Sequence, residues 1–131
     1  MLLRRPRVLI AEDHVELAKA VGRVLSLDCD VVGSVVDGGA VLDAVQRLQP
    51  DAIVLDLNLP NVDGLELCRQ ITHMNPEAKV IVFTAMNDPD IRQRCFELGA
   101  SAFVSKMASH GDGDLFSTIK RLCRAEVDQT T

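Results

Sequence analysis

The sequence lacks tryptophan and tyrosine altogether, and phenylalanine occurs only four times in 131 residues. Large aromatic side chains commonly stack on flat, conjugated rings such as that of a flavin. Their scarcity therefore speaks against a flavin-dependent electron carrier.

Cysteine motifs for metal binding or disulfide exchange are also missing. The four cysteines are far apart and form no CxxC pair: Cys29, Cys68, Cys95 and Cys123. This spacing excludes the common zinc and redox motifs, and the three histidines share no ligand spacing either. Three of the cysteines lie on apolar helical stripes, so we expect buried core residues in a reducing compartment.

Long hydrophobic runs and clustered positive charge are absent too. No apolar run approaches the roughly 20 residues of a membrane span, and the apolar start at residues 1–3 is too short for a signal peptide. The net charge is −5, and we expect the one basic cluster, Arg4, Arg5 and Arg7, to be a solvated leader. We therefore expect a cytoplasmic protein that by itself binds neither nucleic acid nor a membrane.

The chain length suits a single domain, which we expect to span residues 1–131 with a core from about 7 to 125. Apolar, β-prone runs alternate with apolar residues at helical spacing. The predicted strands are 7–11, 30–36, 53–56, 79–84 and 102–105, and the predicted helical stripes are 17–25, 41–48, 65–74, 91–98 and 115–123. This alternation predicts an α/β sandwich with a parallel sheet and right-handed crossovers.

Doubly wound sheets of this size commonly have the strand order 2-1-3-4-5, the flavodoxin-like arrangement. Functional side chains then gather at the carboxyl ends of the strands, near the point where the strand order reverses. In this sequence that edge would collect Glu12, Asp13, Asp56, Thr84 and Lys106.

The predicted strand 53–56 ends in the carboxylate of Asp56 and is followed by the turn residues Pro60, Asp63 and Gly64. Taken alone, Asp56 could simply terminate the strand, because Asp, Asn, Pro and Gly all favour turns. An Asp carboxylate can instead be a nucleophile that accepts a phosphoryl group. The polar residues at the other strand ends favour this second interpretation.

Three carboxylates, those of Glu12, Asp13 and Asp56, would repel one another unless a cation or protons neutralise them. Mg²⁺ prefers oxygen ligands and usually keeps several waters, so two carboxylates and the backbone carbonyl of Asn58 would suit it. As an isolated pair, however, Glu12 and Asp13 would also fit the start of a helix, where acidic side chains cap free N–H groups.

Lys106 and Thr84 would place an ammonium group and a hydroxyl donor at the same edge. Phosphoryl transfer depends mainly on positioning and on the neutralisation of charge. Seen singly, Lys106 is an ordinary surface lysine and Thr84 an ordinary strand residue. Their coincidence with the acids at four strand ends indicates a phosphoryl site.

The chain also resembles the receiver domains of two-component response regulators, from about Arg7 to Cys123. The resemblance is carried by VLIAEDH (8–14), VLDLNLP (54–60) with DG (63–64), VIVFTA (80–85) and GASAFVSK (99–106). It implies that Asp56 accepts the phosphoryl group. It also implies that Mg²⁺ binds Asp13, Asp56 and the Asn58 carbonyl, with Glu12 assisting.

The same resemblance implies a switch rather than an enzyme, although the domain would promote its own phosphorylation and dephosphorylation. Thr84 and Lys106 would contact the phosphoryl group, and Phe103 would turn inward behind Thr84. The face made by the fourth helix, fifth strand and fifth helix would then change and contact an output domain or a second copy. Asn58 and Met86 would tune the phosphate lifetime, and the donor would be a sensor histidine kinase or a phosphotransfer protein.

Two features depart from the usual receiver pattern. Met107 follows Lys106 where many receivers have proline, so a cis peptide bond is not expected there. The link from Ala108 to Asp114 is a little longer and looks more flexible than the usual link into the last helix.

Other function classes fit the sequence less well. A flavodoxin-like carrier would have Ser, Thr and Gly after the first strand, whereas the acids found there would repel a cofactor phosphate. An aspartyl phosphatase of the haloacid dehalogenase type would carry its nucleophile on the first strand, not the third. A receiver-like interaction module that is never phosphorylated stays an alternative, and the chain is either a stand-alone receiver or part of a longer protein.

Overall fold

The computed structural model describes residues 4–107 and 114–128, with side chains described as far as Cys123. Most of the predicted link from Ala108 to Asp114 thus lies outside the described residues. The elements in chain order are β1 (Arg7–Ala11), α1 (Val15–Leu25), β2 (Asp30–Val35), η1 (Gly38–Ala40), α2 (Val41–Leu48), β3 (Ala52–Leu55), α3 (Gly64–Met74), β4 (Lys79–Thr84), α4 (Pro89–Glu97), β5 (Ala102–Ser105) and α5 (Leu115–Asp128).

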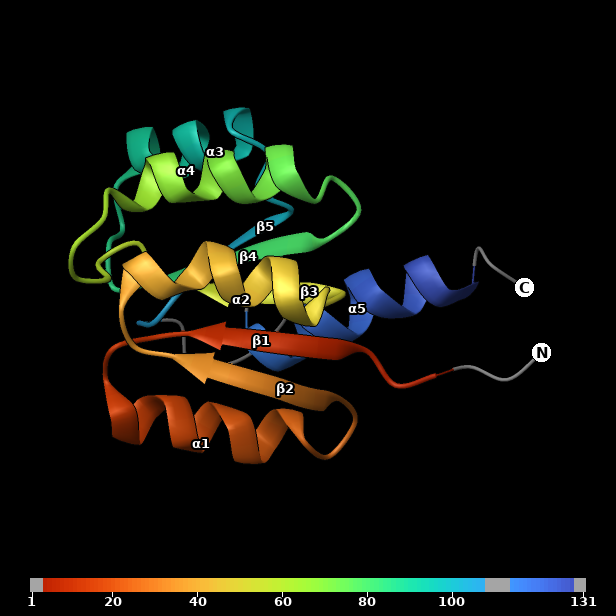
Figure 1. Ribbon diagram of the computed structural model, residues 1–131. Coiled ribbons are helices and arrows are strands. Elements are labelled where there is room, and N and C mark those ends of the chain that lie inside the picture. The colour runs from red at the N-terminus through yellow and green to blue at the C-terminus, as the bar shows by residue number, and fades with distance from the viewer. Residues whose placement is uncertain (1–3, 108–113, 129–131) are drawn as a thin grey trace.

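The five strands form one parallel sheet in the order β2-β1-β3-β4-β5, which confirms the predicted fold. In the register of the sheet, Ala11 pairs with Leu55, Leu55 with Val82, and Thr84 with Ser105. The residues that follow these strands therefore meet at one edge. Figure 1 shows this edge at the left, whereas β1 starts and α5 ends at the opposite side.

Alternate residues of the strands face two separate hydrophobic cores, because successive side chains in a strand point to opposite faces of the sheet. One core packs α2, α3 and α4 against strand residues such as Leu9, Ile53 and Val80. The other packs α1 and α5 against strand residues such as Val8, Val54 and Ile81. Burial on both faces explains why the strand sequences are continuously apolar.

All four cysteines are buried, which confirms the prediction for Cys68, Cys95 and Cys123 and adds Cys29. Cys68 of α3 and Cys95 of α4 belong to one core, and Cys29 and Cys123 belong to the other. Burial raises the pKa of the Cys68 thiol to about 11, with a smaller contribution from Cys95. The Cys68 thiol is therefore uncharged at neutral pH and acts as a small apolar side chain.

The basic cluster near the amino end is exposed to solvent at Arg4 and Arg5, as predicted, but it is attached to the fold and is not a free leader. The Arg4 guanidinium donates two hydrogen bonds of 2.6 Å to the carboxylate of Asp51. The Arg5 guanidinium donates hydrogen bonds to two backbone carbonyl oxygens in the link between α1 and β2. The Arg7 guanidinium donates one to the backbone carbonyl oxygen of Gln49. These partners are distant in the sequence, so local periodicity could not indicate them.

Two further observations concern the backbone and the helices. No peptide bond among residues 4–107 and 114–128 is cis. Within the same residues, no helix combines the length and the apolar character that crossing a membrane requires.

Candidate functional site

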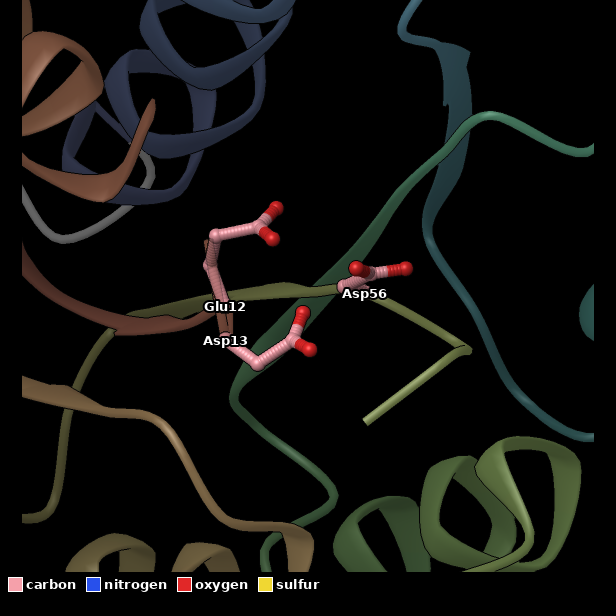
Figure 2. Close-up of side chains that lie close together, drawn as sticks. All are labelled: Glu12, Asp13 and Asp56. Carbon is pink, nitrogen blue, oxygen red and sulfur yellow. The ribbon is translucent and has the colours of Figure 1, made fainter. Parts of the chain in front are cut away.

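Three carboxylates meet at the carboxyl edge of the sheet. Glu12 and Asp13 follow β1, and Asp56 follows the neighbouring strand β3, where its N–H donates to the carbonyl of Ala11 at 3.0 Å. Ligand oxygens of the three acids lie within 4.8 Å of one another, and Figure 2 shows the carboxylates converging on one space. Glu12 is 2% exposed and Asp56 4% exposed, whereas Asp13 is open to solvent.

Lys106, which follows β5, bridges two of these acids. Its ammonium nitrogen lies 2.6 Å from Oε1 of Glu12 and 3.0 Å from Oδ2 of Asp56. The contact to Glu12 lacks the angles of a hydrogen bond, so this buried oxygen has an ion pair but no hydrogen-bond partner among the described residues. One ammonium opposes three carboxylates, and the site therefore keeps an excess of negative charge.

The ionisation of this cluster follows from burial and pairing. Burial raises the pKa of Glu12, and interactions with Lys106 and with the N–H of His14 offset only part of that effect. Burial lowers the pKa of Lys106, but the ion pair with Glu12 and the hydrogen bond and ion pair with Asp56 more than compensate, so its pKa is raised. Lys106 is therefore a cation at neutral pH.

His14, and not Asp13, caps the start of α1. Nδ1 of His14 accepts a hydrogen bond of 3.0 Å from the N–H of Leu17, and Glu12 Oε2 accepts one of 3.1 Å from the N–H of His14. Asp13 makes no hydrogen bond to any described residue. The capping interpretation therefore fails for Asp13, whose carboxylate is open to solvent beside the two buried acids.

Asn58 and Thr84 lie beside the acidic cluster in different ways. The N–H of Asn58 donates to Oδ1 of Asp56 at 3.0 Å, so both carboxylate oxygens of Asp56 have a partner. Thr84 is fully buried, and its hydroxyl oxygen accepts a hydrogen bond of 3.3 Å from the N–H of Met86. No described residue accepts a hydrogen bond from the Thr84 hydroxyl, which leaves its proton available.

Phe103 and Phe83 lie on neighbouring strands. Phe103 of β5 is half-buried and packs against the core beneath α2, α3 and α4. Sequence reasoning missed Phe83 of β4, whose ring centre lies 5.6 Å from the ammonium nitrogen of Lys106. A phenylalanine inside an apolar strand carries no sign of such a contact, which helps to hold the lysine in place.

The family of the chain follows from comparison with known sequences. The profile of the response regulator receiver domain family matches residues 8–120. The chain belongs to this family. The receiver is a signalling domain, and receivers act together with histidine kinases and output domains.

Individual relatives agree with this assignment. Response regulator MprA of Mycobacterium sp. strain KMS is 32% identical over 100 residues, which cover 76% of this receiver and 44% of MprA. A protein-glutamate methylesterase/protein-glutamine glutaminase 2 of Koribacter versatilis is 36% identical over 104 residues, which cover 76% of this receiver and 28% of that protein. The chain thus spans less than half the length of these two curated relatives.

Solved structures of receivers have the same fold. The BeF3-activated receiver domain of DrrB from Thermotoga maritima matches with a TM-score of 0.80 at 26% identity, covering 92% of this chain and 99% of that chain. Receivers bind Mg²⁺ at an acidic pocket, and the acidic cluster of this chain consists of Glu12, Asp13 and Asp56. The hard oxygen donors and the excess negative charge of these residues fit a divalent cation.

Proposed function

We propose that this receiver accepts a phosphoryl group on Asp56 in a Mg²⁺-dependent reaction. The phosphoryl donor would be a sensor histidine kinase or a phosphotransfer protein in the cytoplasm. The observation that carries the proposal is the convergence of Glu12, Asp13 and Asp56 on one space, with the Lys106 ammonium already in contact with two of them. All the acids and Lys106 are present, which speaks against a module that is never phosphorylated.

Two hydrogen bonds to the carboxylate of Asp56 support this role. The N–H of Asn58 holds Oδ1 and the Lys106 ammonium holds Oδ2, so the side chain cannot turn away from the site. One carboxylate oxygen would form the new P–O bond while the bond between phosphorus and the leaving nitrogen of a phosphohistidine breaks. The nitrogen keeps the bonding electron pair.

Neighbouring side chains would stabilise the transferred group. Asp13, Asp56 and the carbonyl of Asn58 would hold Mg²⁺, with Glu12 assisting. When bound, Mg²⁺ would supply positive charge that neutralises the phosphoryl oxygens. Lys106 would exchange its contact with Asp56 for one with a phosphoryl oxygen.

The hydroxyl of Thr84 would read out the phosphorylation. Its proton has no acceptor among the described residues, so it can be donated to a phosphoryl oxygen when Thr84 moves inward. The half-buried Phe103 would then turn into the space behind Thr84, and the face of α4, β5 and α5 would change. This face would contact an output domain or a second copy of the chain.

The aspartyl phosphate would be short-lived, because water can attack an acyl phosphate beside a metal. Asn58 is exposed and Met86 half-buried, and both flank the site. We expect these two side chains to tune the lifetime by limiting the approach of that water. In this sense the receiver would promote its own phosphorylation and dephosphorylation without being an enzyme for another substrate.

Labelling with acetyl phosphate tests the proposed phosphoacceptor. Wild-type protein should be phosphorylated in the presence of Mg²⁺ and not in EDTA, whereas Asp56→Asn should not be phosphorylated at all. Asp43→Asn is a matched control, because among the residues that the structure describes this exposed carboxylate pairs only with Arg47, one helical turn away. Labelling that survives in Asp56→Asn, or that is unchanged by EDTA, would rule out the assignment.

A further inference from the structure

The loop between β3 and α3 carries both Asp56 and Asn58, and its inner part is fixed by close packing. Leu57 and Leu59 are buried in the core. Gly64, the first residue of α3, lies so close to the backbone of Leu57 that a Cβ atom there would stand 2.2 Å from the Leu57 carbonyl oxygen. The loop thus folds back on itself around the two site residues.

The outer part of this loop, Pro60–Val62, is held by a different segment, the turn that follows β2. The N–H of Gly38 donates to the carbonyl oxygen of Pro60 at 3.1 Å. The side-chain amide of Asn61 donates to Oδ2 of Asp37 at 3.1 Å, and Oδ1 of Asp37 accepts from the N–H of Gly39 at 2.8 Å. The carboxylate of Asp37 therefore stabilises its own turn and also binds the loop between β3 and α3, called the site loop below.

The contact at Gly38 leaves no room for a side chain. A Cβ atom on this buried glycine would lie 2.1 Å from Cγ2 of Val62 and 3.0 Å from the Pro60 carbonyl oxygen. Since valine is stiff about its first side-chain bond, the loop would have to move outward to accept even a methyl group. The position of Pro60–Val62 is therefore set by the turn at Asp37 and Gly38.

We propose that the turn at Asp37 and Gly38 positions residues 60–62 and, through the backbone of the same loop, the carbonyl of Asn58, and thereby tunes the affinity of the site for Mg²⁺. The inference rests on the proposed function, in which the Asn58 carbonyl is a ligand. A carboxylate ligand can adjust by rotating its side chain, but a main-chain carbonyl moves only with its backbone. Residues that hold a ligand in place commonly change metal affinity by an order of magnitude or more. Asp37 and Gly38 would be positioning residues without contact to the phosphoryl group.

Gly38→Ala is the sharpest test, because its added methyl group is directed at one side chain. We expect Mg²⁺ to bind about 3- to 10-fold more weakly to this variant, a milder loss than that of a direct supporting residue. Val62→Ala removes both methyl groups that the new Cβ would meet, so the double variant Gly38→Ala/Val62→Ala should recover most of the affinity. The Mg²⁺ dissociation constant is measured by NMR titration, at a temperature where circular dichroism shows each variant folded.

Asp37→Ala provides a second variant that adds no atoms. It should also weaken Mg²⁺ binding. Asp37→Asn should bind Mg²⁺ nearly as tightly as wild type, because the side-chain oxygen of the new asparagine can still accept a hydrogen bond from the N–H of Gly39. The amide of Asn61 can turn so that its oxygen accepts a hydrogen bond from the NH2 group of the new asparagine. Asp43→Ala is the control for the loss of an exposed aspartate and should bind Mg²⁺ normally.

The outcomes separate this inference from the proposed function. If wild-type protein binds Mg²⁺ and Asp56→Asn does not, but Gly38→Ala and Asp37→Ala bind as tightly as wild type, the positioning role is overturned while the proposed function stands. If wild-type protein does not bind Mg²⁺, both fail. A third result would also contradict the positioning role. In it, the double variant Gly38→Ala/Val62→Ala binds Mg²⁺ as weakly as Gly38→Ala, and Asp37→Ala binds Mg²⁺ as tightly as wild type.

Discussion

At the scale of single residues, Asp51 ties the amino-terminal segment to the sheet. Its carboxylate accepts two hydrogen bonds from Arg4 and one of 2.8 Å from the N–H of Arg7. Burial raises the pKa of Asp51, but the hydrogen bonds and charges of these two arginines outweigh burial, so the pKa lies below its ordinary value. The ionised form of Asp51 is therefore the form that stabilises the fold.

Asp51→Asn should lower the free energy of unfolding at neutral pH by about 1 kcal/mol, a modest value because Arg4 is largely exposed. Because the folded pKa is depressed below the unfolded value of about 3.9, the wild-type advantage exists above that pH. It is lost as the pH falls through the folded pKa. Urea unfolding followed by circular dichroism measures this, since the chain has no Trp or Tyr.

The exposed Asp43 serves as the control for this pH dependence. Asp43→Asn breaks only an ion pair within α2, to Arg47 at 3.7 Å, and should change stability little at any pH. A stability difference between wild type and Asp51→Asn that is equally large in neutral and strongly acidic solution would disprove the role given to Asp51.

At the scale of elements, α3 and the end of α4 are joined by a tight contact. Thr72 of α3 donates from its hydroxyl to the carbonyl of Leu98, which ends α4, at 2.9 Å. Gly99 follows with a φ of 108°, in a region that only glycine enters easily, and a Cβ there would lie 2.8 Å from Cγ2 and Oγ1 of Thr72. Both backbone and packing therefore require glycine at this helix end.

Gly99→Ala should destabilise the fold by about 2 kcal/mol or more, because backbone strain and the clash with Thr72 add together. In the Thr72→Ala background the contacts with Cγ2 and Oγ1 disappear, whereas the backbone strain and the contact of 2.9 Å with Cβ of residue 72 stay. The same substitution should therefore cost less, with a coupling of about 1 kcal/mol. Thermal unfolding of the two single variants and the double variant gives this coupling.

Gly22→Ala provides a matched glycine control within α1. A Cβ there would meet only Cδ1 of Ile10, at an ordinary 3.7 Å, so alanine should be neutral or stabilise the helix by up to about 1 kcal/mol. Equal costs for Gly99→Ala in the wild-type and Thr72→Ala backgrounds would show that Cγ2 and Oγ1 of Thr72 contribute nothing to the requirement for glycine.

At the scale of the whole molecule, the proposed phosphorylation would change a surface that lies away from the acids. The path proposed above runs from the site through Thr84 at the end of β4 to Phe103 on β5, two strands that pair in parallel. A phosphoryl group adds up to about two negative charges at neutral pH. Two arrangements that differ by about 2 to 4 kcal/mol would suffice for a large shift in population.

Beryllofluoride with Mg²⁺ should mimic the phosphoryl group and change the amide NMR shifts of Thr84, Phe103 and much of residues 86–125. The physical reason is that the mimic attracts the Thr84 hydroxyl and thereby opens space for Phe103. Asp56→Asn is the control and should show no such changes. Shift changes confined to the loops at the strand ends, with Phe103 and residues 86–125 silent, would mean that the readout lies elsewhere.

The sequence by itself determined the alternation of strands and helices and the residues that end each strand. Periods of two and 3.6 residues are local properties, so the elements follow from neighbouring side chains. In a parallel sheet the carboxyl ends share one edge, which brings Asp13, Asp56 and Lys106 to the same place once the strand order is known. The motifs around these residues were sufficient to predict the family.

Only the tertiary structure decided which groups pair across the fold. The bridge from Lys106 to Glu12 as well as Asp56, the attachment of Arg4 to Asp51, and the support of the site loop by Gly38 all join segments far apart in the chain. Strand register and the close approach of loops fix such pairs. Local propensity carries no information about either, because it depends only on residues a few positions away.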